Sequence, residues 1–386
     1  MEITYVATCL FGLEKFLGEE IDALGYKRIS TIDGRVTFKG DISAVARCNI
    51  GMRFAERLYI KLGEFTADSF DSLFEGTKAL PWEDFIGERD SFPVSGHSVK
   101  SKLFSIPDCQ SIVKKAIVER LKTKYHLSFF PESGVLYKVE FFILNDIASL
   151  MIDTSGVALH KRGYRPASNA APLRETLAAA LVKIARPRDD VLFWDPMCGS
   201  GTIAIEAAMM QTNRAPGASR AFDAEKFPQI EHEIWKRARE EAHDKIISDS
   251  SFEVYASDID PACVALTREN IRRAGVGATV KAFERNALEI KTGGRRGTVV
   301  CNPPYGERLF SMQQAEELYR NMGRAFTSLD NWQIYVLTSH EGFERLYGRR
   351  ADKVRKLYNG MIKCNFYQFF KKRDDFSPKS KGNFKK

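Results

Sequence analysis

The chain has 386 residues, 44% of them hydrophobic, which is enough for about two or three domains with packed cores. Its formal net charge of +8 favours a polyanionic partner. No apolar run approaches the length of a membrane span, and the first residues show no basic and apolar signal segment. The seven cysteines include no CxxC pair and the six histidines show no metal-ligand spacing. We therefore expect a protein of the reducing cytoplasm that holds no metal.

The first 157 residues read as two small α+β modules. Strand, helix and hairpin patterns follow one another over residues 2–51, with Asp33-Gly34 as the hairpin turn, and this unit looks ferredoxin-like. The second module is expected to hold helices near 69–79 and 108–124 and strands over 136–144 and 147–153. The predicted domains are residues 1–55, 56–157 and 158–372, followed by a basic flexible tail over 373–386.

Residues 97–124 form a basic strip that contains seven Lys and Arg residues and only two acidic residues. Phe104 and several serines lie between the basic residues. Such a strip suits a single-stranded RNA end or loop, although a solvated helix face has the same composition. A second basic segment at 160–165 suits either RNA or ion pairs with carboxylates of the neighbouring module. The candidate RNA contacts are Lys100, Lys102, Phe104, Lys114, Lys115, Lys122, Arg162 and Arg165.

A glycine turn between a strand and a helix is the first candidate for a cofactor site. The apolar strand 191–194 runs into Asp195-Pro196-Met197-Cys198-Gly199-Ser200-Gly201-Thr202 and then a helix over 203–210. The glycines let the backbone approach a ligand, and the start of the helix favours a carboxylate. The turn lacks both the third glycine of the dinucleotide fingerprint and the P-loop lysine. Asp195 would repel a pyrophosphate but suits an amine or a sulfonium, and S-adenosylmethionine carries both.

A second acidic strand end follows 63 residues later. The strand 252–258 ends at Asp258, the position that grips ribose hydroxyls in nucleotide folds, and Ile259 is placed to pack on an adenine. Asp260 is instead expected to cap the helix that begins at Pro261.

The strand 299–301 stops at Asn302-Pro303-Pro304-Tyr305, because proline has a fixed φ and no N–H. The Asn302 side chain and the Asn302 and Pro303 carbonyls can accept hydrogen bonds, and a base stacked on Tyr305 would gain ~1–3 kcal/mol. Two acceptors that grip a planar aromatic amine help it toward tetrahedral geometry in the transition state. The same tetrapeptide also reads as a core strand that ends at prolines beside an incidental tyrosine.

The remaining elements complete an α/β pattern. Residues 211–250 form an insertion with a charged helix over 229–247, which is either a lid, an RNA contact or a solvated helix. A mostly parallel sheet finished by an antiparallel hairpin is expected from the elements at 261–274, 279–283, 298–301, 313–329, 333–339 and 353–370, with Asn359-Gly360 as the hairpin turn.

The segments DPMCGSGT, SDIDP and NPPYGERL, in this order, resemble class I S-adenosylmethionine-dependent methyltransferases that modify exocyclic amines. HKRGYR and APLRETLAA look like the THUMP-containing ribosomal RNA guanine-(N2)-methyltransferase family, and the likeness covers nearly the whole chain. It implies a Rossmann-like seven-stranded α/β sheet with a C-terminal antiparallel hairpin, preceded by a ferredoxin-like and THUMP RNA-binding region. By position it assigns the cofactor's methionine end to residues 195–202, its ribose to Asp258, its adenine to Asn286 and Ala287, and the target base to Asn302, Pro303, Pro304 and Tyr305.

The expected activity is therefore methyl transfer from S-adenosylmethionine to the 2-amino group of a guanosine in RNA, with 23S ribosomal RNA as the favoured substrate. Transfer RNA and the 6-amino group of adenine are the alternatives within the same chemistry. Two further alternatives lie outside this chemistry. A noncatalytic RNA-binding or assembly protein is disfavoured by the intact motifs, and a nucleotide-dependent oxidoreductase is disfavoured by the missing third glycine.

Overall fold

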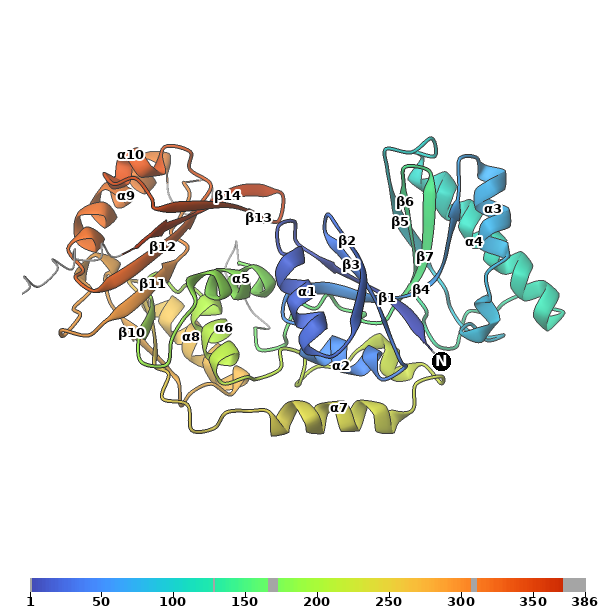
Figure 1. Cartoon of the computed structure of the whole chain (residues 1–386), viewed down its shortest axis with the longest axis horizontal. Coiled ribbons are helices and arrows are strands. Elements are labelled where there is room, and N and C mark those ends of the chain that lie inside the picture. The colour runs from blue at the N-terminus through green and yellow to red at the C-terminus, as the bar shows by residue number, and fades with distance from the viewer. Residues whose placement is uncertain (1, 128, 166–172, 307–310, 371–386) are drawn as a thin grey trace, which may run out of the picture.

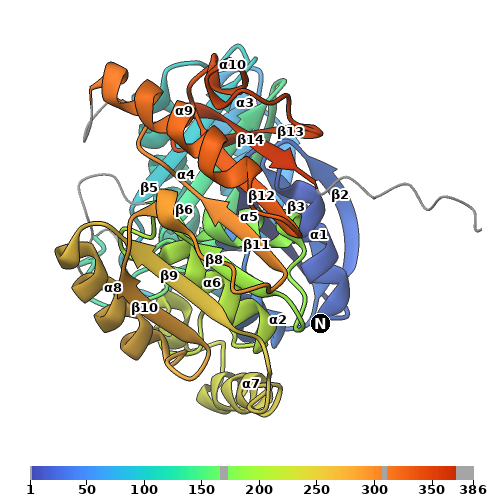
Figure 2. The same ribbon diagram turned by 90° about the vertical axis from the view of Figure 1, so that its left-hand side faces the viewer.

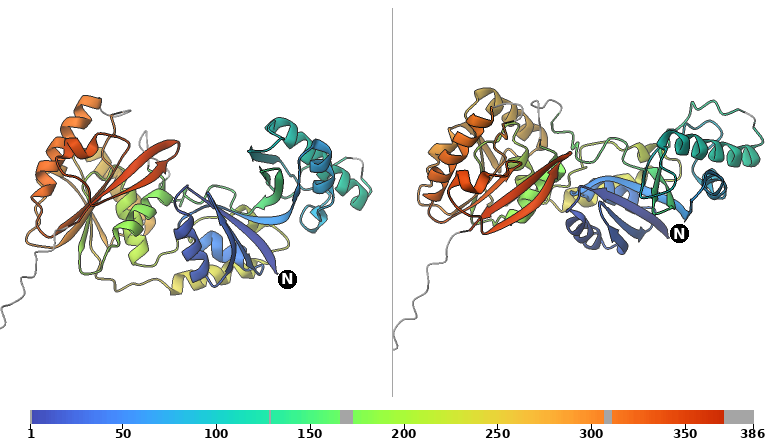
Figure 3. Two further views of the ribbon diagram at one scale, coloured as in Figure 1. Left: turned by 45° about the horizontal axis from the view of Figure 1, so that its top comes forward. Right: turned by 90° about the horizontal axis from the view of Figure 1, so that it is seen from above.

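The computed structural model describes residues 2–127, 129–165, 173–306 and 311–370, and within them the chain forms two seven-stranded sheets (Figure 1). The first module lies between the second module and the C-terminal domain, so the molecule is elongated (Figure 3). Within the described ranges, no helix combines the length and the apolar character needed to cross a membrane. The tail predicted over 373–386 lies outside the described residues.

The first sheet is built by residues 3–153, and its strands lie in the order β2-β3-β1-β4-β7-β6-β5. All its neighbouring strands are antiparallel except β5 and β6. The strands are β1 (Ile3–Cys9), β2 (Lys27–Ile32), β3 (Arg35–Gly40), β4 (Ala55–Thr66), β5 (Val94–Val99), β6 (Val139–Leu144) and β7 (Ile147–Asp153). The helices α1 (Glu14–Ala23), α2 (Ala44–Gly51), α3 (Phe70–Lys78) and α4 (Ile106–Tyr125) pack on one face, with the short turn η1 (Trp82–Asp84).

The long strand β4 belongs to both modules. Its first half, from Ala55 to Ile60, pairs with β1, and its stretch from Tyr59 to Thr66 pairs with β7. The boundary predicted between residues 55 and 56 therefore falls at the start of a strand that carries one continuous sheet through both modules. The sequence does not show that one strand crosses this boundary with both of its edges hydrogen-bonded.

The face of this sheet that the helices leave open is concave. Arg35 of β3 places its guanidinium 3.2 Å from the ring centroid of Phe142 in β6. Three strands separate β3 from β6, which corresponds to about 19 Å in a flat sheet at the usual strand spacing. Because neither side chain spans that distance, the sheet must curl strongly toward its open face. A small apolar cluster of Val6, Tyr59 and Met151, with Phe142 beside it, lines the concave side.

The second sheet has the order β10-β9-β8-β11-β12-β14-β13, and Figure 2 shows these strands side by side. The strands are β8 (Leu192–Asp195), β9 (Val254–Asp258), β10 (Val280–Glu284), β11 (Gly297–Cys301), β12 (Trp332–Thr338), β13 (Lys353–Asn359) and β14 (Ile362–Phe369). The first five are parallel, and β14 runs antiparallel to both β12 and β13. This is the predicted sheet with its terminal hairpin.

Helices cover both faces of the second sheet. Two separate apolar clusters show the division, one shared with the first module and one around α9. The helices are α5 (Glu175–Ala185), α6 (Thr202–Gln211), α8 (Pro261–Ala274), α9 (Met312–Thr327) and α10 (Phe343–Tyr347), with the short turns η2 (Asp223–Lys226) and η3 (Ala287–Glu289). Two elements were not predicted from the sequence, the short helix α10 and, in the first sheet, β5, whose Ser, Gly and His residues give no apolar alternation.

The insertion over 211–250 ties the C-terminal domain to both modules. Its helix α7 (His232–Asp244) packs along α2 (Figure 1). Gln229 donates to the carbonyl oxygens of Asp84 and Phe85 at 3.0 and 2.9 Å, and the Phe227 ring stacks on Tyr137. The insertion is therefore a strut between domains. The charged face of α7 is exposed, as predicted for a solvated helix, while Trp235 and Ala238 on its other face are buried.

Candidate active site

Three neighbouring parallel strands bring the predicted cofactor and target motifs to one edge of the second sheet. β8 lies between β9 and β11. Asp195 and Asp258 are the last residues of β8 and β9, and Asn302 directly follows β11. The carboxyl ends of adjacent parallel strands form the usual ligand-binding crevice of an open α/β sheet. The spatial order of the strands thus groups residues that stand up to 107 positions apart in the sequence.

Side chains of α8 hold the glycine turn in place. Gly199 and Gly201 adopt left-handed φ values of 53° and 80°, and a side chain at Gly201 would place its Cβ 2.7 Å from Thr267. The Thr267 hydroxyl donates to the Gly199 carbonyl oxygen at 3.0 Å, and the Asn270 amide donates to that of Ser200 at 2.9 Å. These two supports were not predicted, because Thr267 and Asn270 lie 68 and 70 positions downstream of their partners and show no local sequence signal.

The two strand-end acids differ in environment. Asp195 is 1% exposed, and burial raises its pKa well above the ordinary value, with the nearby charge of Asp258 adding to the effect. Its one bond among the described residues is a 3.3 Å contact from the Met197 N–H. Asp258 accepts from the N–H groups of Gly199 and Asp260 at 2.9 and 3.1 Å. A buried, poorly bonded carboxylate at a ligand turn is stabilised by a cationic ligand, so Asp195 fits the amine or sulfonium of S-adenosylmethionine.

The residues expected around the adenine are also at this edge. Ile259 is 65% exposed, so its apolar side chain remains available for a planar ring. Asn286 caps the turn η3 through a 3.0 Å bond from the Leu288 N–H, and Ala287 is buried behind it. One oxygen lone pair of Asn286 therefore serves a local cap, and its contact with adenine stays a prediction.

The Asn302–Tyr305 loop is tied together by hydroxyl groups. The Tyr305 hydroxyl donates to Asn302 Oδ1, and the Tyr319 hydroxyl of α9 donates to the Pro304 carbonyl oxygen at 2.7 Å. No donor to the Pro303 carbonyl is found within the described part of the chain. The loop thus keeps one backbone acceptor, while Tyr319, which the sequence analysis did not single out, fixes the adjacent peptide.

The cysteines of the two motifs are interior packing groups. Cys198 and Cys301 are buried, and burial raises the pKa of both thiols well above the ordinary value. Cys198 contacts the Thr267 hydroxyl at 3.5 Å, and Cys301 donates to the Tyr335 carbonyl oxygen at 3.8 Å. Neither thiol has the thiolate character of a nucleophile.

The prediction that Arg162 contacts RNA is wrong, because its side chain is 2% exposed. It donates to the carbonyl oxygens of Leu159 and Arg53 at 2.6 and 2.5 Å and pairs with Glu206 at 3.5 Å. Glu206 of α6 is fully buried and also meets Arg53 and the Tyr164 hydroxyl at 3.5 and 3.2 Å. Arg162 therefore belongs to an ionic cluster at the junction of the first module and the C-terminal domain.

Arg165 is also turned inward, with a side chain only 7% exposed, so the prediction of a surface RNA contact is wrong here too. It pairs with Glu175 at 2.9 Å and donates to the Thr202 hydroxyl at 2.7 Å and the Leu173 carbonyl oxygen at 3.0 Å. The other predicted role of this segment, pairing with acids of the neighbouring module, is seen at His160, whose Nδ1 lies 2.8 Å from Glu56.

The basic strip of the second module is largely paired with acids. Lys102, Lys114 and Lys122 lie 3.2, 2.6 and 2.9 Å from Asp68, Glu132 and Glu119. Lys100 and Lys115 are exposed without a carboxylate within 4.0 Å in the described residues, and Phe104 is 84% exposed. These three side chains remain the best candidates of the strip for an RNA contact.

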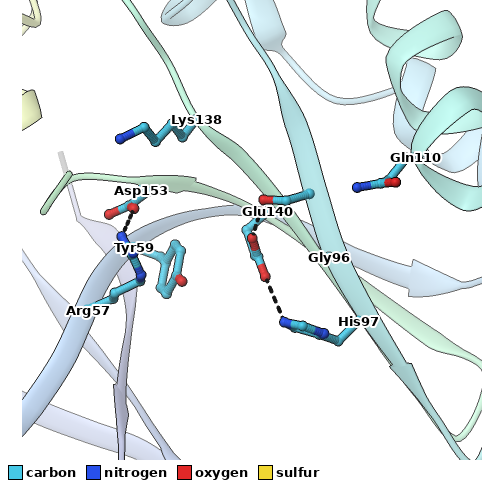
Figure 4. A pocket seen from close by; sticks show the side chains of 9 residues that line it. Arg57, Tyr59, Gly96, His97, Gln110, Lys138, Glu140 and Asp153 are labelled. Carbon is cyan, nitrogen blue, oxygen red and sulfur yellow. Dashed lines mark hydrogen bonds and ion pairs between the residues drawn. The ribbon is translucent and has the colours of Figure 1, made fainter. Parts of the chain in front are cut away.

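A pocket of about 320 Å³ opens on the concave face of the first sheet (Figure 4). Arg57 pairs there with Asp153, and His97 lies 3.7 Å from Glu140. Lys138, at the rim, pairs with Asp223 of the insertion at 2.9 Å. Because each cation has a carboxylate partner, this pocket is close to neutral.

Three family models match this chain, one for each of its two N-terminal modules and one for its C-terminal domain. Residues 162–368 match the methyltransferase domain of the RMKL-like family, residues 4–59 the RlmL ferredoxin-like domain, and residues 67–153 the THUMP domain. The chain belongs to the RMKL-like methyltransferase family. The predicted family and fold class are thereby confirmed.

Individual relatives of this methyltransferase extend the likeness to almost its full length. YpsC of Bacillus subtilis (strain 168), named as an RNA methyltransferase, is 46% identical over 96% of both chains. The ribosomal RNA large subunit methyltransferase K/L of Syntrophotalea carbinolica is 33% identical over 95% of this chain, which spans 53% of that longer protein. The crystal structure of SMU.472, a methyltransferase by name, superposes with a TM-score of 0.90 at 41% identity, covering 96% of this chain and 99% of that one. SMU.472 was solved with S-adenosylhomocysteine, which agrees with S-adenosylmethionine as the expected cofactor.

The two aspartates at 258 and 260 should separate cofactor binding from helix capping. We expect Asp258→Asn to weaken S-adenosylmethionine binding by about tenfold or more, because it disturbs both the expected ribose contact and the Gly199 N–H. Asp260 accepts from the Ala262 N–H at 2.8 Å as the N-cap of α8, so Asp260→Ala should cost about 1 kcal/mol of stability and leave cofactor affinity intact. Calorimetry and chemical denaturation of both variants give the comparison, and equal cofactor losses would contradict this division.

Proposed function

We propose that this enzyme transfers a methyl group from S-adenosylmethionine to the exocyclic 2-amino group of a guanosine in RNA, with 23S ribosomal RNA as the substrate. The observation that carries the proposal is the Asn302–Tyr305 loop, whose amide, Pro303 carbonyl and aromatic ring follow the strand next to the glycine turn. Planar acceptors beside an aromatic ring suit an amine whose lone pair is delocalised into a base.

The cofactor site is formed by the turn and the two neighbouring strand ends. In this proposal Asp195 and the start of α6 bind the amine and the carboxylate of the methionine end, and Asp258 at the end of β9 binds the ribose. Gly199 and Gly201 give the turn its left-handed φ values, and Gly201 lets it pack closely against Thr267 of α8. When bound, S-adenosylmethionine supplies an activated methyl group.

The target loop positions the amine and stabilises the charge that develops on it. Asn302 Oδ1 and the Pro303 carbonyl oxygen accept its hydrogens, and Tyr305 supports the face of a base flipped from its stack. In the described structure the Tyr305 hydroxyl occupies one lone pair of Asn302, so the amine uses the other. The proton leaves to solvent after transfer, so alignment matters more than a strong base.

RNA as the substrate is supported by the THUMP match and by the names of YpsC and the K/L relative. The name of the K/L protein points to large-subunit ribosomal RNA. The acceptors of the target loop suit the amino groups of both guanine and adenine. The choice of guanine therefore rests on the family resemblance of the segments around that loop.

Mapping of methylated nucleosides by mass spectrometry in cells with and without this protein tests the proposal. We expect one N2-methylguanosine of 23S ribosomal RNA to disappear and to return when the gene is restored. Loss of N6-methyladenosine instead, or loss confined to transfer RNA, would contradict the assigned base or substrate.

A further inference from the structure

A second pocket opens at the opposite edge of the second sheet from the methyltransferase site. Its cavity is about 260 Å³, and it is lined at the amino ends of β8, β11 and β12. Thr298 of β11 and Gln333 of β12 are paired neighbours in the sheet and form its floor. Arg186, which ends α5, and the loop before β8 form its wall. This is below the usual size of small-molecule sites and suits a compact group.

The side chains of this pocket are suited to donate hydrogen bonds. The lining includes the guanidinium groups of Arg186, Arg188 and Arg296. Gln333 accepts from the Tyr335 hydroxyl at 2.7 Å through its oxygen, which leaves its NH₂ end to donate. Of the described residues that line the pocket, none is acidic. The lining therefore fits an oxyanion.

Nearby acids do not neutralise the three guanidinium groups. Asp190 lies 3.0 Å from Arg188 and 2.6 Å from Arg296, so one carboxylate serves both. Arg186 has no carboxylate within 4.0 Å across the described ranges. A cation at the end of α5 also complements the helix dipole, but that effect does not explain Arg188 and Arg296. Two positive charges remain at this concave site.

The pocket on the first sheet provides a contrast within the same molecule. There Asp153 and Glu140 line the cavity and neutralise Arg57 and His97 (Figure 4). The pocket at Arg186 is smaller and carries an excess of guanidinium groups. Its charge, and not merely its concavity, thus distinguishes it as an anion site.

We propose that the pocket formed by Arg186, Arg188, Arg296, Thr298 and Gln333 binds a phosphate group. Its source is either a backbone phosphate of the RNA substrate or free phosphate. The first source rests on the proposed function and means that the RNA reaches around the catalytic sheet to its amino edge. Bidentate guanidinium contacts to phosphate oxygens are the chemistry of the site.

The test compares two sets of arginine substitutions in the full chain. Arg186→Gln, Arg188→Gln and Arg296→Gln are combined in one variant. The matched control combines Arg272→Gln and Arg273→Gln on α8, because these two arginines also share one exposed acid, Glu269, at 2.7 Å. Inorganic phosphate is titrated by NMR of the arginine side chains, and RNA binding is measured by filter binding at several salt concentrations.

We expect the triple variant to lose phosphate binding, to bind RNA about fivefold more weakly at low salt, and to show a salt slope reduced by about 1. The control should change RNA affinity by less than about twofold, and S-adenosylmethionine affinity should stay constant in both. Loss of phosphate binding with unchanged RNA affinity assigns the site to free phosphate. If the wild-type protein does not bind RNA, the proposed function fails, while the phosphate titration still tests whether this pocket binds phosphate. Unchanged phosphate binding in the triple variant overturns the inference.

Discussion

Replacement of Asn302 by alanine should lower the turnover number about 100-fold or more. The amide oxygen at this position accepts from the target amine most strongly when positive charge develops on it, so its loss raises the barrier without weakening the ground state. S-adenosylmethionine affinity should change by less than about twofold, because the glycine turn and Asp258 stay intact. Single-turnover kinetics on methylatable RNA, with calorimetry of the cofactor, give both quantities.

The hydroxyl of Tyr305 provides the control for this experiment. In the structure it donates to Asn302 Oδ1, so Asn302→Ala also removes a support of the tyrosine ring. Tyr305→Phe removes the hydroxyl, with this bond and the 3.8 Å contact from the Cys364 thiol, and keeps the stacking face. We expect it to cost less than about fivefold in turnover. A loss as large as that of Asn302→Ala would assign the effect to ring position, and an unchanged rate in Asn302→Ala would remove the residue from the mechanism.

Substitution of Glu206 by glutamine should destabilise the protein by about 3 kcal/mol or more. The change keeps the shape of the side chain but removes the charge that faces Arg53 and Arg162 in the interior. Two buried guanidinium groups then lose a counter-ion, and the remaining carbonyl contacts of Arg162 only partly compensate. Urea denaturation measures the loss, and hydrogen exchange should show increased opening at the start of α6.

The matched surface change is Glu269→Gln on α8. Glu269 pairs with Arg272 and Arg273 at 2.7 Å, but it is 39% exposed, so its removal should destabilise the protein far less than the change at Glu206. A similar stability loss in the two variants would show that the buried cluster does not hold the junction.

The site motifs could be predicted because their chemistry is local in sequence. Glycines at positive φ, an acid at a strand end and prolines that stop a strand each leave a pattern of a few residues. The order of parallel strands then brings Asp195, Asp258 and Asn302 to one edge. Sequence periodicity likewise predicted most helices and strands within a few residues of their observed bounds.

The burial of Arg162 and Arg165 could not be predicted in this way. Arg162 meets Glu206, which is 44 positions away, and the Arg53 carbonyl, 109 positions away. A basic segment looks the same in sequence whether its partners are phosphates or interior carboxylates. These contacts also mean that removing residues 1–155 would leave Glu206 without Arg53. The isolated C-terminal domain is therefore a poor test of whether residues 1–155 bring RNA to the active site.

The strand β4 has a mechanical consequence. Because β4 is hydrogen-bonded to β1 of the ferredoxin-like module and to β7 of the THUMP module, one continuous sheet joins the two modules. The THUMP module therefore has no hinge at this strand. The strut at Gln229 and the ionic junction at Arg53 fix both to the catalytic domain. If the proposed RNA substrate binds the THUMP module, the distance between that module and the catalytic loop is fixed. We therefore expect only those RNAs to be modified whose bound segment and target base are separated by this distance.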